Sequence, residues 1–398
     1  MNDNRNPKQD PRRRSIPPHP MTEREAIRRS TTRPRRRKPT ATGILAVIVI
    51  LALVAVLAVC GYNIATGRHL PDEHRSELAD SLMATGSSET QLSTPNVNPF
   101  TEERVSDDEM HKGSLILVNF AHEYVFPKDE SSLVSIYENK NDYYKVAYTD
   151  YKLDETTLRC FNRLVSELGR TTGDRTLLVN SSYRSYEDQV DVYQSFTESN
   201  GADYAQRYVA QPGQSEHHTG LALDLTTMRD DGTYVVMENY EYLPQFNALA
   251  VQRGFTQRYP ENKYDYTHIN TEPWHYRYVG VPHAYIMWRL GLCLEEYTDY
   301  LRTYTADGRI LTVADGTGEL GECSSATLPE TGYAVYFCPA SGKGETVLPI
   351  PTSASSHEVS GNNVDGFIVT AVFGEPTLPE ATSAATAHSA RQSQNTGA

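Results

Sequence analysis

The distribution of apolar residues divides this chain of 398 residues into segments of different character. Residues 43–61 (GILAVIVILALVAVLAVCG) form an uninterrupted, uncharged apolar stretch. Residues 62–112 are rich in Ser, Thr, Asn, Asp and Glu and contain few bulky apolar side chains, which predicts a flexible spacer. Residues 113–304 mix apolar and polar positions over a length that suffices for one domain with its own core.

Within residues 113–304, the spacing of apolar side chains predicts both strands and helices. The expected strands are 114–119, 143–148, 175–184 (which runs into a loop) and 220–225. The expected helices are 153–169, ended by Gly169; 185–198, with Ser185 as N-cap; 247–255; and 282–303, with a proline at its start. Together these elements predict an α+β domain, with a small, mainly antiparallel sheet flanked by helices.

Beyond residue 304 the pattern changes to short β-like runs separated by Gly-rich turns. The runs RILTV, YAVYFCP and GFIVTAVF (Gly366–Phe373) predict a small β-rich appendage over residues 305–374. It is expected either to pack on the preceding domain or to cap it. Residues 375–398 are dominated by Ser, Thr, Ala and Gln, which predicts a disordered tail.

The apolar stretch at 43–61 predicts a single transmembrane helix, because at 1.5 Å per residue it spans roughly 28 Å, about the thickness of the bilayer core. Residues 1–40 hold 13 Lys and Arg against 4 Asp and Glu, a net charge of +9, so the remainder of a chain whose formal charge is −14 carries −23. Basic residues before a span favour the cytoplasmic side. Residues 1–42 are therefore expected to form a cytoplasmic tail, with the chain after residue 61 outside the cytoplasm.

Two other interpretations of the N-terminal region carry less weight. A cleaved signal peptide would have an unusually long basic region, and no small-x-small cleavage site follows the apolar run. The basic run Arg35–Lys38 (RRRK) by itself suggests nucleic-acid binding, but the rest of the chain is strongly acidic. No nucleic-acid partner is expected.

Four of the five cysteines follow the predicted membrane span: Cys160, Cys293, Cys323 and Cys338. An extracytoplasmic location permits disulfides, and four cysteines allow three pairings. Cys323 with Cys338 is the local pair, whereas Cys160 with Cys293 would join two predicted helices; the sequence does not choose between them. None forms a CxxC pair, so neither a thiolate zinc site nor a redox motif is indicated.

His217, Asp224 and His275 are the residues most informative about chemistry. They lie in the segments Ser215–Asp224 (SEHHTGLALD) and Glu272–His275 (EPWH). Two imidazoles, one carboxylate and an open fourth position are what a hydrolytic zinc ion (Zn²⁺) requires, because water must occupy that position. Three such residues at arbitrary positions would be ordinary polar groups, but here separate motifs coincide, which favours zinc ligation.

The local sequence around these residues is consistent with such a site. Glu272 lies three residues before His275 and can accept a proton from water at the metal. Pro273 disfavours a regular helix, so Glu272 and His275 should project from an extended segment. Gly220 permits the tight turn that brings His217 and Asp224 together.

Three separated blocks carry a family resemblance. The motifs S-x-H-x-x-G-x-A-x-D and E-x-W-H, the upstream block Ser181–Gln189 (SSYRSYEDQ) and the tail Glu272–Gly280 (EPWHYRYVG) resemble the VanY-type D-alanyl-D-alanine carboxypeptidases of the M15 metallopeptidases. The resemblance covers roughly residues 113–304. It implies a hedgehog/DD-peptidase-like fold, one zinc ion and stem peptides of bacterial peptidoglycan as substrates. Together with the predicted membrane span, it leads us to expect the protein at the bacterial cell membrane.

The resemblance also implies roles for individual residues. Arg184 corresponds to a family residue that supports the negative charge developing on the scissile carbonyl or holds the substrate. An ion pair of Arg184 with Asp188 or Glu187 is the alternative. Expected to form hydrogen bonds with the substrate are Ser182, Gln189 and Ser215.

Neighbouring residues of the motifs are expected to be less important. His218 stands where relatives often carry an amide, and we expect it beside the ligands rather than among them. Glu216 is expected to be a solvated neighbour. Trp274 is expected to pack and thereby to hold Glu272 and His275 in place.

The resulting functional hypothesis is a D,D-carboxypeptidase that removes the C-terminal D-Ala from stem peptides. An L,D-carboxypeptidase acting on tetrapeptide stems shares the same motifs and stays open. A noncatalytic wall-binding module is a third possibility, although the intact Glu272 and Arg184 argue against it. A serine penicillin-binding carboxypeptidase is excluded, because it needs S-x-x-K and none of the lysines follows a serine by three positions.

Overall fold

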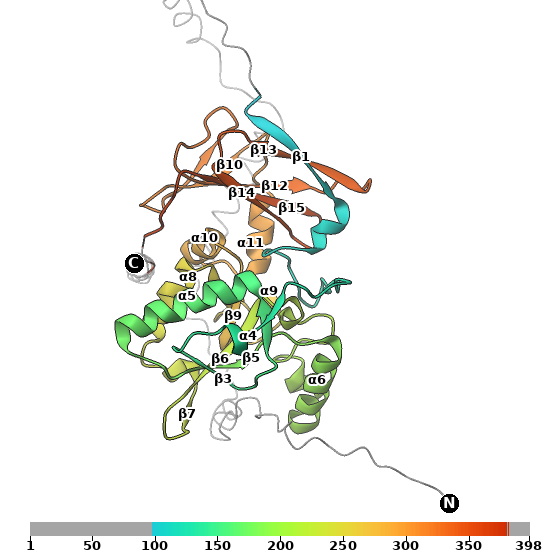
Figure 1. Cartoon of the computed structure of the whole chain (residues 1–398). Helices are drawn as coiled ribbons and strands as arrows, with labels where there is room; N and C mark the ends of the chain where they lie inside the picture. Colours follow the sequence, from blue (N-terminus) through green and yellow to red (C-terminus); the bar gives the residue numbers. More distant parts are fainter. Residues whose placement is uncertain (1–97, 380, 382–398) are drawn as a thin grey trace, which may run out of the picture. The chain divides into compact units, whose positions relative to one another are not determined.

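A sheet of six strands forms the centre of the peptidase region (Figure 1). Its strands are β3 (Lys145–Val146), β5 (Leu177–Ser181), β6 (Ala222–Met228), β7 (Tyr234–Val235), β8 (Phe255–Tyr259) and β9 (Glu272–Tyr278). The main order is β3-β5-β6-β9-β8, with β7 paired to β6, and only the β3–β5 pair is parallel. This computed structural model describes residues 98–379 and Ala381.

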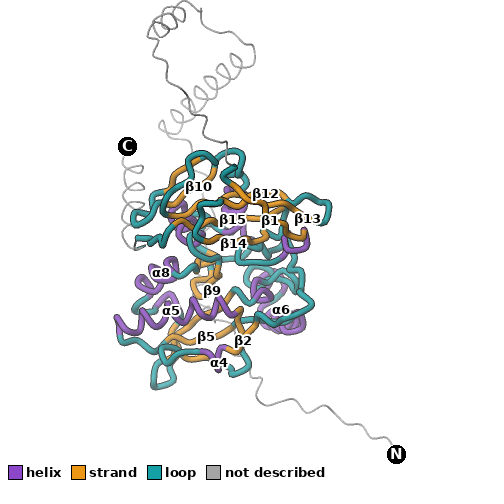
Figure 2. Tube along the Cα trace, turned by 45° about the horizontal axis from the view of Figure 1, so that its top comes forward, coloured by secondary structure: helices purple, strands orange, loops and turns teal. Residues whose placement is uncertain are grey.

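Helices and a small sheet surround these strands. The longer helices are α5 (Glu155–Thr172), α6 (Tyr186–Asn200), α8 (Leu243–Gln252), α10 (His283–Leu290) and α11 (Leu294–Leu301). The short elements are α4 (Ile136–Asn139), α7 (Ala202–Ala205), α9 (Tyr264–Thr267), the 3₁₀ helices η1 (Asp107–His111), η2 (Glu216–Thr219) and η3 (Met237–Asn239), and the paired strands β2 (Leu133–Ser135) and β4 (Lys152–Asp154). Figure 2 shows α5 and α8 lying together, away from α6. The mixed α+β fold expected from the sequence is confirmed.

Helices α5 and α6 begin where the sequence predicts them. Asp154 caps α5 by accepting a hydrogen bond from Thr157 N, and Ser185 caps α6 in a reciprocal capping box with Asp188. Helix α5 nevertheless continues past Gly169. The glycine is needed there because the Tyr143 ring packs directly against the helix: a Cβ at this position would lie 2.1 Å from that ring. The helix ends at Gly173, whose φ of 78° is left-handed.

Two predicted elements differ in the structure. Residues 114–119 are buried but do not form a strand, because the Arg277 guanidinium takes the carbonyls of Ser114 and Ile116 that a neighbouring strand would otherwise use. The helix expected at 282–303 is two helices, α10 and α11, because Gly291 ends the first with a φ of 66°.

The C-terminal appendage is a β region that also recruits an N-terminal strand. The strands β10 (Ile310–Val313), β11 (Leu320–Cys323), β12 (Gly332–Pro339), β14 (Ser356–Gly361) and β15 (Gly366–Phe373) form a sheet in the order β11-β10-β12-β15-β14. The strand β13 (Glu345–Pro351) pairs antiparallel with β1 (Phe100–Ser106). The end of the predicted spacer is thus folded structure, because β13 supplies its backbone partners.

The β region packs on the peptidase region through one shared core. Buried side chains of α10 and α11, such as Ile286 and Tyr297, belong to the same cluster as Val335 and Val369 of the β region. His283 of α10 also contacts the Tyr297 hydroxyl (Nδ1, 2.7 Å) and Thr370 Oγ1 of β15 (Nε2, 2.8 Å). Of the two arrangements expected for the appendage, the structure shows packing on the preceding domain.

The four cysteines of the described region are all free thiols. Cys323 lies on β11 and Cys338 on β12, and strand β10 separates them in the sheet. Because neighbouring strands are about 4.8 Å apart, two cysteines with a strand between them exceed the Cα separation that a disulfide allows. Neither pairing considered from the sequence is present.

The expected membrane helix at 43–61 and the tail 1–42 lie outside the described residues, as do most of the spacer and residues 382–398. Within the described part of the chain, every helix is too short or too polar to cross a bilayer.

Candidate metal centre

His217, Asp224 and His275 meet at one end of the central sheet. Asp224 on β6 stands directly opposite His275 on β9 in the antiparallel register, and His217 reaches them from η2. Asp224 Oδ2 lies 3.3 Å from His217 Nε2, and Asp224 Oδ1 lies 3.0 Å from His275 Nδ1. One ligand atom from each residue falls within 4.8 Å of the others. The turn at Gly220, with a φ of 70°, allows η2 to lead directly into β6.

The orientation of the His217 ring is set by the backbone. Its Nδ1 lies 2.6 Å from the carbonyl oxygen of Ser182, which can only accept a hydrogen bond. Nδ1 therefore carries the proton, and the lone pair of Nε2 faces Asp224. Such a bond to the distal nitrogen is how proteins orient a histidine that binds a metal.

The orientation of the His275 ring is set by a carboxylate. Its Nδ1 faces Asp224, whereas its Nε2 lies 3.4 Å from Glu216 Oε2. Glu216 was expected to be solvated, but this expectation is wrong: its side chain is completely buried. The chain turns at η2, which directs Glu216 inward beneath the ligands rather than outward.

Two buried arginines hold Glu216 in place. Its Oε1 accepts hydrogen bonds from Arg258 Nε at 2.7 Å and from Arg277 NH1 at 2.8 Å. Arg258 also donates to both oxygens of Glu295, at 2.9 and 2.6 Å. The two guanidinium charges are thus balanced by two carboxylates, as a buried ionic group requires. The sequence analysis did not predict this network, because its members are far apart in the chain. Glu216 and Arg277 do lie within the quoted motifs, but nothing in the motifs shows that the two side chains meet.

Burial and neighbouring charges shift the pKa values of the three proposed ligands. Burial, assisted by the nearby charge of Arg184, lowers the pKa of His217 to about 4. Burial also lowers the pKa of His275, but hydrogen bonds to Asp224 and Glu216 outweigh it and raise the pKa to about 9. Burial would raise the pKa of Asp224, yet the two imidazoles hold it well below its usual range. A metal must therefore displace a proton from His275 to bind.

Glu272 lies beside the ligand triad. It is the first residue of β9, so the extended segment expected from Pro273 is confirmed. Its Oε2 is 3.8 Å from His275 Nδ1. Burial raises the pKa of Glu272 to about 8, although His275 opposes the shift. A carboxylate whose pKa is moved toward neutrality is suited to accepting and returning a proton.

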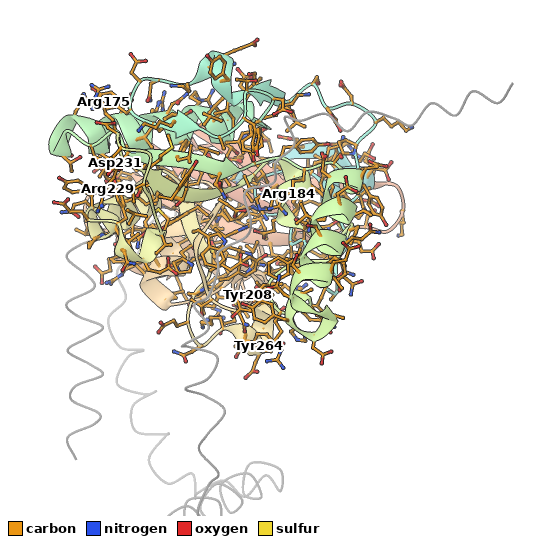
Figure 3. The ribbon with its side chains drawn as sticks, turned by 90° about the horizontal axis from the view of Figure 1, so that it is seen from below. Arg175, Arg184, Tyr208, Arg229, Asp231 and Tyr264 are labelled. Atoms are coloured by element: carbon orange, nitrogen blue, oxygen red, sulfur yellow. The ribbon has the colours of Figure 1, made fainter. Side chains whose placement is uncertain are left out.

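Arg184 is aimed at the triad from the segment that precedes α6. Its NH2 donates to Asp224 Oδ2 at 3.1 Å, NH1 donates to Gln189 Oε1 at 2.7 Å and Nε donates to Ser181 Oγ at 3.0 Å. Figure 3 shows Arg184 among the packed side chains next to α6. The carboxylate partner that the structure gives Arg184 is Asp224, with NH2 and Oδ2 3.1 Å apart.

The three residues expected to contact substrate are all buried. Gln189 uses its amide within the protein, since Oε1 accepts from Arg184 and Nε2 donates to Ala210 O. Ser215 caps η2 by accepting from His217 N. Ser182 Oγ has no hydrogen-bond partner among the described residues. Gln189 and Ser215 thus bond within the protein, whereas the Ser182 hydroxyl is buried without a hydrogen-bond partner among the described residues.

His218 lies next to the triad without joining it. Its Nε2 accepts a hydrogen bond from Gly213 N at 3.0 Å, so Nδ1 carries the proton and donates to Arg184 O at 2.8 Å. Both ring nitrogens of His218 are therefore engaged in hydrogen bonds with backbone atoms. The ring lies within an aromatic cluster, with centroids 4.9 Å from Phe126 and 6.3 Å from Tyr124.

The donor set fits zinc. Ligand distances of about 2.0–2.1 Å in tetrahedral geometry place neighbouring ligand atoms roughly 3.3 Å apart. Each Asp224 oxygen lies near that spacing from one imidazole nitrogen, with Oδ2 3.3 Å from His217 Nε2 and Oδ1 3.0 Å from His275 Nδ1. Both imidazoles have their other nitrogen bound by an acceptor, which completes the surroundings that metal-binding histidines need.

The chain is similar to known enzymes. A sequence-family model described as VanY, D-alanyl-D-alanine carboxypeptidase, matches residues 150–281. A D-alanyl-D-alanine carboxypeptidase of Enterococcus faecium is 30% identical over 277 residues, 69% of this chain and 80% of that protein. The bifunctional D-Ala-D-Ala dipeptidase and D-Ala-D-Ala carboxypeptidase VanXYC of Enterococcus gallinarum is 33% identical over 156 residues, 38% of this chain and 80% of that protein.

A solved structure is also similar. The vancomycin-resistance D,D-dipeptidase VanXYg, in complex with a D-Ala-D-Ala phosphinate analogue, superposes with a TM-score of 0.57 at 29% identity. The superposition covers 69% of this chain and 99% of that protein. It therefore extends beyond residues 113–304 into the flanking β region.

Fold and site together define a metallocarboxypeptidase. The sheet and the adjoining 3₁₀ helix η2 bring together two imidazoles and a carboxylate that could hold a metal ion, with a buried glutamate beside them. The chain belongs to the D-alanyl-D-alanine carboxypeptidase (VanY) family, as the relative from Enterococcus faecium shows.

Proposed function

We propose that this chain is a zinc-dependent D,D-carboxypeptidase that removes the C-terminal D-Ala from peptidoglycan stem peptides. The observation that carries the proposal is the convergence of His217, Asp224 and His275 at ligand spacing, with Glu272 buried beside them, in a member of this family. The zinc ligands in this proposal are His217 Nε2, His275 Nδ1 and an oxygen of Asp224.

A zinc ion in this site would lower the pKa of a water molecule to roughly 7 and polarise the scissile carbonyl. Glu272 takes the proton from the attacking water and returns it to the departing amine. Arg184 directs a permanent positive charge at the same place and stabilises negative charge on the substrate, because its guanidinium is fixed by Ser181 and Gln189. The free hydroxyl of Ser182 is the candidate donor to the substrate backbone.

The first experiment measures which peptide is cut. The full-length protein, purified without chelator, is incubated with a stem pentapeptide, a stem tetrapeptide or the dipeptide D-Ala-D-Ala, each with and without a zinc chelator, and the products are weighed by mass spectrometry. Loss of one alanine from the pentapeptide, abolished by chelator, is the expected result. Cleavage of the tetrapeptide alone would make it an L,D-carboxypeptidase, and zinc binding without cleavage would make it a wall-binding module.

We further propose that residues 43–61 anchor the chain in the bacterial cell membrane, with residues 1–42 in the cytoplasm and the catalytic region outside. The uncharged stretch and the basic residues before it support this orientation. Protease added to intact spheroplasts should digest the region after residue 62 and leave the first 42 residues protected. Protection of both regions would contradict the proposed orientation.

A further inference from the structure

A cavity of about 340 Å³ lies apart from the metal centre. Its walls come from the turn at 119–122, from α9, from α11 and from the β14–β15 connection. The lining side chains that matter here are Asn119, Phe120, Tyr266, Glu295, Asp299 and Arg302. None of the proposed metal ligands lines this cavity.

Exposed aromatic rings mark one wall of the cavity. Phe120 and Tyr266 are 48% and 49% exposed, respectively. The Phe120 ring stacks on His268, with centroids 3.8 Å apart and planes 18° apart, and His268 stacks in turn on Tyr264. Figure 3 shows Tyr264 at the edge of the ribbon. Exposed, contiguous aromatic rings indicate a binding surface, and their flat faces suit ligands that combine apolar and polar parts.

Polar side chains also line the cavity. Arg302 donates from Nε to Asp365 Oδ2 at 2.8 Å and also pairs with Asp299 one helical turn away. Carboxylate and guanidinium groups accept from and donate to hydroxyl groups respectively, so they can bind a ligand rich in hydroxyls. Exposed aromatic rings and charged, hydrogen-bonding groups in one cavity are the combination that a sugar ring requires, because its C–H face packs on a ring and its hydroxyls bond to the polar groups.

The aromatic wall is held rigidly. Asn119 N and His122 N donate to each other's carbonyl oxygens, and Asn119 Nδ2 donates to Glu295 Oε1 at 3.1 Å. Glu295 is itself bound by two nitrogens of the buried Arg258. The turn that presents Phe120 is thus fastened to the interior, which reduces the entropy lost when a ligand binds.

The same segment leads from the cavity to the metal centre. After the turn it continues to Tyr124 and Phe126, whose rings surround His218 beside the triad. Tyr124 N also donates to Gly213 O, so the segment is anchored there. The eight residues from 119 to 126, joined by seven Cα–Cα steps, span at most roughly 25 Å, and an extended pentapeptide spans roughly 17 Å. The cavity and the surroundings of the metal centre are thus joined by one segment whose greatest length is comparable to that of a stem peptide.

We propose that this cavity binds the glycan strand of peptidoglycan while the metal centre acts on the C-terminal end of the stem peptide. That the polymer is peptidoglycan rests on the proposed function. That a sugar binds rests on the side chains that line the cavity. A substrate attached to its glycan is then held at two places, which raises its affinity over that of the free peptide.

Glycan binding is tested directly by calorimetry. Glycan oligosaccharides stripped of their stem peptides are titrated into the full-length protein and into its Phe120→Ala and Tyr266→Ala variants. Each substitution should weaken binding about tenfold, as expected for the loss of one aromatic anchor. Tyr234→Ala, which removes a ring of similar exposure from β7, is the matched control and should leave binding unchanged.

A kinetic comparison adds a second readout. The ratio of kcat/KM for a disaccharide-pentapeptide to that for the free pentapeptide should fall in Phe120→Ala and Tyr266→Ala, with free-peptide turnover unchanged, which also shows that the variants are folded. Loss of all peptide cleavage with retained glycan binding would refute the proposed function alone. Absence of glycan binding by the wild type, equal affinity in all variants, or binding of the peptide cross-bridge instead would overturn the glycan site.

Discussion

The Nε2 atom of His275 lies 3.4 Å from Glu216 Oε2, and the carboxylate is held there by two buried guanidinium groups. The proposed ligand His275 is thereby oriented from behind, with Nδ1 turned toward Asp224 and the metal position. A carboxylate that accepts the distal N–H also makes the imidazole a stronger ligand. The Glu216 side chain therefore connects the buried charge network to the chemistry of the site.

Glu216→Gln should lower zinc affinity by roughly 10- to 100-fold, because the carboxylate that orients His275 is lost. The free energy of unfolding of the variant should also be lower by about 3–5 kcal/mol, because two buried arginines lose their charged partner. Zinc affinity is measured by competition with a chromophoric chelator on folded protein. Glu295→Gln is the control, because it disturbs the same arginine without touching His275. If both variants bound zinc equally well, the orienting role of Glu216 would be wrong.

Glu272→Ala should retain zinc and lose turnover by roughly 10²–10⁴-fold, the usual contribution of a general acid–base residue. His275→Ala should lose both zinc and activity, because it removes a ligand. Zinc content by atomic absorption and the rate of D-Ala release distinguish the two outcomes. Substantial turnover by Glu272→Ala with zinc bound would contradict the assignment of the base.

Arg184→Lys keeps the charge but loses the planar fork that contacts Asp224, Gln189 and Ser181. If Arg184 stabilises the transition state, kcat and kcat/KM should fall together by roughly 10²–10³-fold. If it holds the substrate, KM should rise while kcat stays constant. Gln189→Ala should change the same kinetic constant as Arg184→Lys, but by a smaller factor, because the Gln189 side chain only positions the guanidinium. Normal kinetics in Arg184→Lys would remove the residue from the mechanism.

The stability of the protein should depend on the protonation of His283. Burial lowers the pKa of His283 to about 3, so the folded protein keeps it neutral where the unfolded chain, at the ordinary value of 6.5, takes up a proton. Stability contributed by this group is complete above pH 6.5 and is lost as the pH falls toward 3. The shift corresponds to a few kcal/mol at most.

Urea unfolding of the wild type and of His283→Gln at pH 7.5 and pH 5 tests this expectation. The variant should be less stable than the wild type at pH 7.5, because His283 bridges Tyr297 and Thr370. The difference between the two proteins should narrow at pH 5. An equal difference at both pH values would show that His283 does not titrate as described.

Local patterns were sufficient wherever the cause of a structure is local. The caps Asp154 and Ser185 lie next to the helices they start, and Pro273 is adjacent to the extended segment it predicts. Residues 114–119, in contrast, have the composition of a strand, but Arg277 takes their carbonyls. Helix α5 passes Gly169 because Tyr143 packs against it. In both cases the deciding partner is distant in sequence.

The sequence by itself determined the proposed ligands His217, Asp224 and His275, the catalytic candidates Glu272 and Arg184, and the α+β class, because these depend on short motifs and on local periodicity. Only the tertiary structure decided that Glu216 is buried beneath His275, that β1 joins the β region and that Phe120 faces a cavity. The physical reason is that burial and charge pairing are set by contacts between segments separated by tens to hundreds of residues. A sequence pattern records which groups are available, and the packing of the sheet decides which of them meet.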